Sequence, residues 1–180
     1  MRMNKSKGQL LILFLAVGFF VGIIYENVIA KSSVVLSDLF LRSNLELYLR
    51  TNIVSEKYLW YVVKARFLLL AMICIFSCFR WKKIFVILCL TVCGFFTGIL
   101  FVAAVMQLGI KGILLCIAGM LPHGIFYVMA YSMLFVYWFR YPESYWNRTK
   151  LLFVIIMFLV GVLLEAYVNP MLLKLIIQIL

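Results

Sequence analysis

Eight polar side chains lie inside long apolar runs of this 180-residue sequence, and their types could support chemistry. Four can carry charge, and the other four donate or accept hydrogen bonds. They are Glu26, Lys64, Arg66 and Glu165, together with Asn27, Gln107, His123 and Asn169. If the apolar runs cross a membrane, every ionisable group at depth is costly and has to face another helix or water.

The four charged residues fall at a similar depth when residues are counted along the apolar runs. Glu26 is near the end of the first run, and Lys64 and Arg66 are in the first two turns of the second. Glu165 is about 21 Å along the last run at a rise of 1.5 Å per residue. Two acids and two bases at one level predict ion pairs that fix helix register. A polar vestibule for a ligand or partner is the alternative.

The single histidine, His123, follows a proline and precedes a glycine. Pro122 removes a backbone donor and Gly124 loosens a helix, so the sequence predicts a kink or break. Membranes tolerate such a break where protein buries it. No His, Cys or Glu spacing around His123 suits a metal. We expect His123 to form a hydrogen bond with a carbonyl freed at the break, and a proton relay is the alternative.

Motifs of membrane enzymes are missing from the sequence. It has no Gly-x-Ser-x-Gly elbow and no His-Glu-x-x-His helix, and no apolar run contains two carboxylates that could work as a pair. The cysteines lie within the apolar runs, where small packing residues are expected; they are Cys74, Cys78, Cys89, Cys93 and Cys116. We therefore expect no catalytic activity, no metal and no cofactor.

The composition indicates the elements that position these side chains. Hydrophobic residues make up 67% of the chain and charged residues 13%, which excludes an ordinary soluble domain. A membrane-spanning helix needs about 20 apolar residues. Five runs meet this length, at residues 9–29, 58–79, 84–108, 112–139 and 151–178. The sequence predicts an all-α polytopic membrane protein with five transmembrane helices, forming a single integral-membrane domain over residues 1–180.

The net charge of +11 indicates how the chain is oriented in the membrane rather than a site that binds nucleic acid. Three short segments each carry three cations: the N-terminal tail, residues 80–83 and residues 140–150. The positive-inside rule therefore predicts a cytoplasmic N-terminus and an external C-terminus. Tyrosine and tryptophan residues beside these segments indicate aromatic belts at the membrane interfaces; they are Tyr137, Trp138, Tyr141, Tyr145 and Trp146 on the inner side, with Tyr58, Trp60 and Tyr61 on the outer side.

The longest connection, residues 31–57, would then be external. Charges recur in it every fourth residue, which predicts alternating ion pairs along one helix face. These candidate partner-docking residues are Asp38, Arg42, Glu46 and Arg50. The pattern indicates an amphipathic helix on the outer membrane surface. A simple extension of the second span is the alternative.

Two short glycine motifs resemble each other. Gly18 and Gly22 belong to the segment Gly-Phe-Phe-Val-Gly-Ile, and Gly94 and Gly98 belong to Gly-Phe-Phe-Thr-Gly-Ile. Small residues four apart let helix backbones approach closely. We expect the first and third spans to pack against their neighbours in similar ways.

Three short segments carry a resemblance to the stage II sporulation protein M family. They are the Gly18-x-x-x-Gly22 motif that precedes the long connection, the glycine-rich residues 98–109 followed by the Leu-Pro-His-Gly-Ile segment at 121–125, and the Glu-Ala-Tyr-Val-Asn-Pro segment at 165–170. The resemblance implies a non-catalytic component of the bacterial cell membrane. In sporulating bacteria such proteins act with two peptidoglycan hydrolases during engulfment of the forespore. The family often has an acidic residue soon after Pro-His-Gly, where this chain has Phe126 and Tyr127.

The sequence and the resemblance together predict a membrane scaffold that anchors extracytoplasmic, peptidoglycan-remodelling partners through residues 31–57. The alternative is a small transporter or an accessory subunit of an ABC-type exporter. It is favoured by the break at His123 and by the charges Lys64, Arg66 and Glu165 within the apolar runs. The resemblance also implies it, since some members of the family are encoded beside ABC transporter genes. Expected partners are membrane lipid and other membrane or cell-wall proteins, such as peptidoglycan hydrolases. Self-association into a homo-oligomer stays open, and nucleic acid is not expected.

Overall fold

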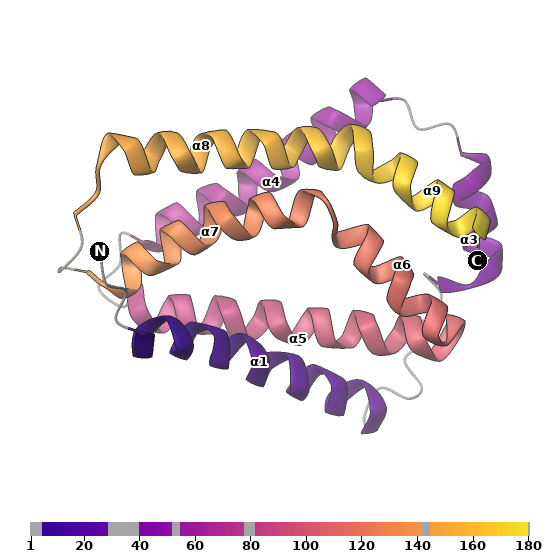
Figure 1. Cartoon of the computed structure of the whole chain (residues 1–180), viewed down its shortest axis with the longest axis horizontal. Helices are drawn as coiled ribbons and strands as arrows, with labels where there is room; N and C mark the ends of the chain where they lie inside the picture. Colours follow the sequence, from indigo (N-terminus) through magenta and orange to yellow (C-terminus); the bar gives the residue numbers. More distant parts are fainter. Residues whose placement is uncertain (1–4, 29–39, 52–54, 78–81, 142–144, 180) are drawn as a thin grey trace. The chain divides into compact units, whose positions relative to one another are not determined.

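The computed structural model describes residues 5–28, 40–51, 55–77, 82–141 and 145–179. Within these ranges the chain is helical and has no strand, which confirms the all-α prediction. The elements are α1 (Lys5–Val28), α3 (Arg42–Arg50), α4 (Ser55–Ser77), α5 (Lys82–Leu108), α6 (Ile110–Met120), α7 (His123–Phe139), α8 (Arg148–Leu163), the π-helix η2 (Leu164–Val168) and α9 (Asn169–Ile179) (Figure 1).

Four stretches of helix in the described residues are long and apolar enough to cross a membrane. They are Gln9–Val28, Glu56–Ile75, Lys82–Leu108 and Arg148–Ile179. A fifth crossing is present if α6 and α7, which are bent by 61° at a short break, form one span. The chain thus has the helices of a multi-pass membrane protein, and the predicted number of five depends on this bent pair.

Two compact units can be distinguished in the structure, and the single domain expected over residues 1–180 stays a prediction. The first unit is Met1–Leu49 with Ile84–Cys116, and the second is Arg50–Lys83 with Ile117–Leu180. Each unit therefore combines segments that are distant in the sequence. The first is built on α1 and α5, and the second on α4, α7, α8, η2 and α9.

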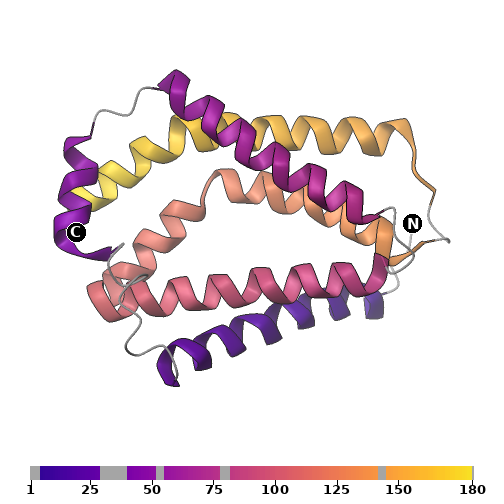
Figure 2. The same ribbon diagram turned by 180° about the vertical axis from the view of Figure 1, so that it is seen from behind.

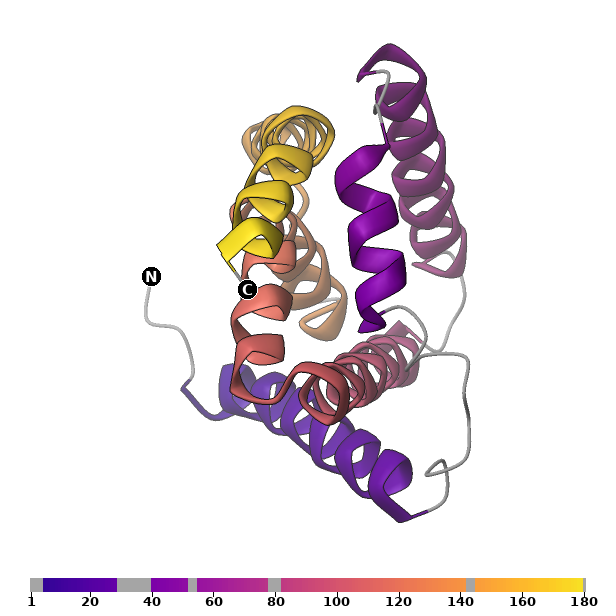
Figure 3. The same ribbon diagram turned by 90° about the vertical axis from the view of Figure 1, so that its right-hand side faces the viewer.

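In the first unit α1 and α5 lie side by side and parallel, and glycine makes this contact possible (Figures 1 and 3). A Cβ added at Gly18 would collide with the carbonyl oxygen of Thr91, and one at Gly94 with that of Leu15. The other two motif glycines meet carbonyl oxygens in the same way, Gly22 that of Phe95 and Gly98 that of Phe19. The two motifs therefore pack against each other rather than against separate neighbours.

This pairing has an internal two-fold relation. Each motif glycine meets the residue three places before the corresponding glycine of the other helix. The aromatic contacts are also repeated when corresponding residues of the two helices are exchanged. Phe19 packs against Phe101 with ring centroids 6.0 Å apart, and its counterpart Phe95 packs against Tyr25 at 5.4 Å. The matching six-residue segments thus form the two halves of a quasi-symmetric helix pair.

A tight helical hairpin completes the first unit. Gly109 has a φ of 63°, a left-handed conformation that suits glycine, and it joins α5 directly to α6. A Cβ at Gly112 would collide with the carbonyl oxygen of Ala104, and the Cys116 Sγ lies 3.9 Å from the Leu100 carbonyl oxygen. The fourth apolar run therefore begins at Ile110, before the predicted residue 112.

In the second unit α7 and α8 run antiparallel, and α4 packs against them (Figure 2). Their buried centre contains Val62 of α4, Tyr127 of α7 and Val162 of α8. Partly buried hydrophobic residues surround this centre; they are Tyr58, Leu59, Val63, Tyr131 and Phe158.

Two long hydrophobic segments that contribute to the second unit are irregular near their middle. Helix α6 ends at Met120 and α7 begins at His123, after a turn that contains Pro122. The last helix continues through the π-helix η2 before α9, and its axis bends there (Figure 1). From the sequence alone, Pro170 predicts an interruption of this last run near Asn169 and Pro170. The irregular turn lies just before them, and both residues belong to α9.

The quasi-symmetric pair gives a testable prediction with a matched control. Gly94→Ala would place a methyl group against the Leu15 carbonyl, and we expect a loss of about 1–3 kcal/mol in the free energy of unfolding. Gly124→Ala puts its methyl in open space, so unfolding should be unchanged or up to about 1 kcal/mol less favourable. Unfolding of both variants in mixed micelles would check this. Equal stability of the two variants would contradict the close packing of α1 on α5.

Candidate functional site

The candidate site is a buried polar cluster in the second unit, centred on Glu165. This residue is 8% exposed and is in the π-helix η2. A π-turn widens the helix by one residue, and such turns are frequent at functional sites. The Asn169 backbone N–H bonds to the Leu164 carbonyl and closes this wide turn.

Arg66 of α4 neutralises the Glu165 carboxylate. Its Nε donates a hydrogen bond of 2.8 Å to Oε2, and its Nη2 donates to Oε1. This two-pronged pairing matches the planar guanidinium to both carboxylate oxygens. The pair joins α4 to η2, so the positions of two helices depend on it.

Tyr127 of α7 contributes a third donor to the same carboxylate. Its hydroxyl donates to Glu165 Oε2 over 2.7 Å, and the Arg66 Cζ lies 5.0 Å from the centroid of its ring. A cation over an aromatic face is attracted by the ring electrons. Tyr127 therefore binds both members of the ion pair and connects them to a third helix.

Gly161 makes room for the Tyr127 ring. A Cβ at position 161 would lie 2.8 Å from the Cε1 atom of this ring, which is shorter than real Cβ contacts. Gly161 is buried in α8, one turn before η2. The absence of a side chain there lets the ring reach across to Glu165. Sequence reasoning missed both residues, because a glycine and a tyrosine in apolar runs are ordinary packing residues.

His123 and Asn169 extend the polar cluster beyond the ion pair. Each is 7% exposed. Within the described part of the chain, His123 Nδ1 and Asn169 Oδ1 are buried without a hydrogen-bond partner. The His123 ring instead stands edge-on to Tyr127, with centroids 5.9 Å apart. The hydrogen bond expected between His123 and a freed carbonyl is therefore not formed by Nδ1.

Of the four charges predicted to pair, the structure brings two together. Lys64 is exposed, because residues two apart on a helix point in different directions and Arg66 takes the inward one. Glu26 is buried in α1 and belongs to the first unit. Pairing thus links the second and last long helices through Arg66 and Glu165.

The predicted docking residues are only partly described. Asp38 lies outside the described residues, as does much of the connection 31–57. Arg42, Glu46 and Arg50 are all exposed on α3. Among the described residues no ion pair joins Glu46 to either arginine, so the predicted ladder of charges is not formed in this part of the helix.

The described residues contain no group of three or more His, Cys, Asp or Glu side chains that could hold a metal ion. No protein family, curated protein or solved structure matches this chain. The resemblance to the stage II sporulation protein M family therefore rests on the short segments that carry it.

The hydrogen bond from Tyr127 gives the second prediction. Tyr127→Phe removes one donor to a buried carboxylate, so we expect a loss of about 1–2 kcal/mol in the free energy of unfolding. Tyr167→Phe is the matched control, because Tyr167 is in the same π-helix but is exposed. Unfolding in mixed micelles measures both variants. A loss of the same size in the control would show that Glu165 does not need this donor.

Proposed function

We propose that this protein is a non-catalytic scaffold of the cell membrane that anchors extracytoplasmic partners. The observation that carries the proposal is the complete engagement of Glu165 by donors of the protein itself. Arg66 and Tyr127 occupy both carboxylate oxygens, and they come from two other helices. A carboxylate bound in this way holds three helices in fixed positions, which suits a rigid anchor.

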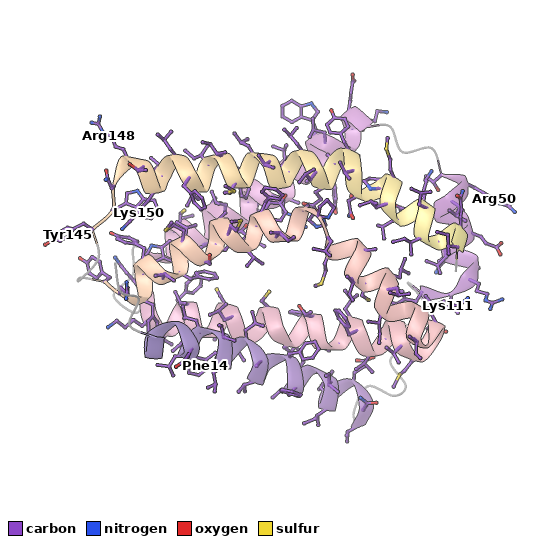
Figure 4. The ribbon with its side chains drawn as sticks, in the orientation of Figure 1. Phe14, Arg50, Lys111, Tyr145, Arg148 and Lys150 are labelled. Carbon is purple, nitrogen blue, oxygen red and sulfur yellow. The ribbon has the colours of Figure 1, made fainter. Side chains whose placement is uncertain are left out.

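Contacts near the start of α8 support a cytoplasmic position for that end of the second unit. The Lys82 Nζ lies 4.0 Å from the centroid of the Tyr141 ring, so two of the cationic connections meet. Tyr145, Arg148 and Lys150 gather at the same end of α8 (Figure 4). Cations concentrated at one end of the spans favour a cytoplasmic position for that end. Trp138 was expected in the interface belt, but it is buried against Phe135.

The parallel course of α1 and α5 supports the same orientation. Both helices begin beside cations, those of the N-terminal tail and Lys83. Parallel neighbours begin on the same side of a membrane, so the chain between them has to cross back, and α4 is long and apolar enough to do so. The connection that contains α3 then lies outside, where a partner of the cell wall can reach it.

The proposal predicts where a partner can be crosslinked. A photoreactive phenylalanine analogue at Ser43, an exposed position of α3, should form adducts with an extracytoplasmic protein in native membranes. The control is the same analogue at Tyr145, which is 86% exposed and belongs to the cationic connection 140–150 that the positive-inside rule assigns to the cytoplasm. No adduct at position 43, or equal adducts of one protein at both positions, would contradict external docking.

A transport-related role is the second candidate, and one observation favours it. The break between α6 and α7 and the π-helix η2 lie in the same unit as the unpartnered atoms of His123 and Asn169. Transporters often bind substrates at discontinuous helices. The role would be that of a small transporter or of an accessory subunit of an ABC-type exporter.

Proton flux separates the scaffold from a small proton-coupled transporter. Purified protein in liposomes that contain a pH-sensitive dye would be tested under an imposed pH gradient, with protein-free liposomes as the baseline. The scaffold predicts baseline flux for both the wild type and Glu165→Gln. A proton-coupled transporter predicts flux in the wild type that Glu165→Gln reduces. Flux above baseline that depends on Glu165 would overturn the scaffold in favour of transport.

A further inference from the structure

The break between α6 and α7 faces the turn that joins η2 to α9. Gly119 lies opposite Leu173, whose Cδ2 is 3.6 Å from the position of a Cβ at residue 119. Tyr127 lies opposite Glu165 through their hydrogen bond. These two contacts lie on either side of the break and of the turn between η2 and α9, and His123 and Asn169 lie between them in the sequence. The two contacts therefore bring the segment that contains His123 beside the segment that contains Asn169.

The backbone beside these two side chains also lacks N–H donors that regular helices would supply. The Leu121 N–H still makes a regular helical bond to the Ile117 carbonyl, but Pro122 has no N–H to continue the series. Pro170 likewise has no N–H to give to the π-turn before it. No side chain caps the first turn of α7. Each proline thus removes one backbone donor next to a buried polar side chain.

Hydrogen-bond acceptors predominate among these groups. Asn169 Oδ1 accepts hydrogen bonds, and His123 Nδ1 accepts when the ring proton is on Nε2. The nearby charges of Arg66 and Glu165 cancel each other through their own bonds. Buried polar atoms without a protein partner are usually satisfied by a bound molecule. An occupant that donates at least two hydrogen bonds fits this arrangement.

We propose that His123 Nδ1 and Asn169 Oδ1 bind one small hydrogen-bond donor, a water molecule or an ammonium ion, between the break and the π-turn. The two sources share the same chemistry, an N–H or O–H group directed at each acceptor. The site is independent of the anchoring role, because it involves neither α3 nor an external partner.

The only histidine of the chain provides a direct probe. Full-length protein with ¹⁵N-labelled histidine is reconstituted in lipid bilayers and studied by nuclear magnetic resonance. The only side-chain signals are then those of the two ring nitrogens of His123. The proposal predicts an unprotonated Nδ1 whose resonance is shifted upfield by an accepted hydrogen bond. It also predicts that magnetisation is transferred from the protons of the bound donor to Nδ1. A protonated Nδ1, or an acceptor resonance without a hydrogen bond, would overturn it, and the wild type suffices for this decision.

Two further arms identify the donor and test Asn169. Spectra are compared in ammonium chloride and in sodium chloride at equal ionic strength. If ammonium is bound, ammonium chloride should shift the Nδ1 resonance until the site is saturated. If water is bound, the cross-peak between water and Nδ1 should be the same in both salts. Asn169→Leu should shift Nδ1 toward the free-acceptor position, whereas the control Asn27→Leu should not, because Asn27 is exposed and bonds to Ile23 in its own helix. An unshifted Nδ1 in a folded Asn169→Leu variant would remove Asn169 from the site.

Discussion

The second unit depends on one electrostatic requirement, the neutralisation of the Glu165 carboxylate away from water. An isolated carboxylate in such surroundings is so unfavourable that it would take up a proton or pull its helix out of place. Arg66 meets this requirement with a planar, two-point contact, and Tyr127 adds a third bond. Since the three residues come from η2, α4 and α7, satisfying one charge also sets the positions of three helices.

The local irregularities of the unit serve the same requirement. The π-turn changes the direction in which Glu165 leaves its helix, and Gly161 opens the space through which the Tyr127 ring passes. A regular α-helix with a larger residue at position 161 would hold the carboxylate and the phenol apart. Irregular backbone and small side chains are tolerated at membrane depth when protein covers them. Here they bring polar groups together inside an apolar core.

The sequence predicted features that depend on one residue or on a short local pattern. It predicted the apolar helices, the disruption beside Pro122 and a buried pairing that includes Arg66 and Glu165. It did not predict that Lys64 would be excluded, that Tyr127 would be the third partner, or that the glycine motifs would face each other. These outcomes depend on which helix faces meet, and a pattern within one helix carries no information about the face of another. The π-turn leaves no motif of its own in the sequence.

The quasi-symmetric contact of α1 with α5 has a consequence for how the first unit forms. Matching helices of this kind, when they are on separate chains, associate by a second-order reaction and come apart on dilution in the bilayer. Here a covalent tether joins the two halves, so their effective concentration is set by the length of the chain and not by the amount of protein. The pair assembles as a unimolecular process. Its stability is therefore the same in a sparsely populated membrane as in a crowded one.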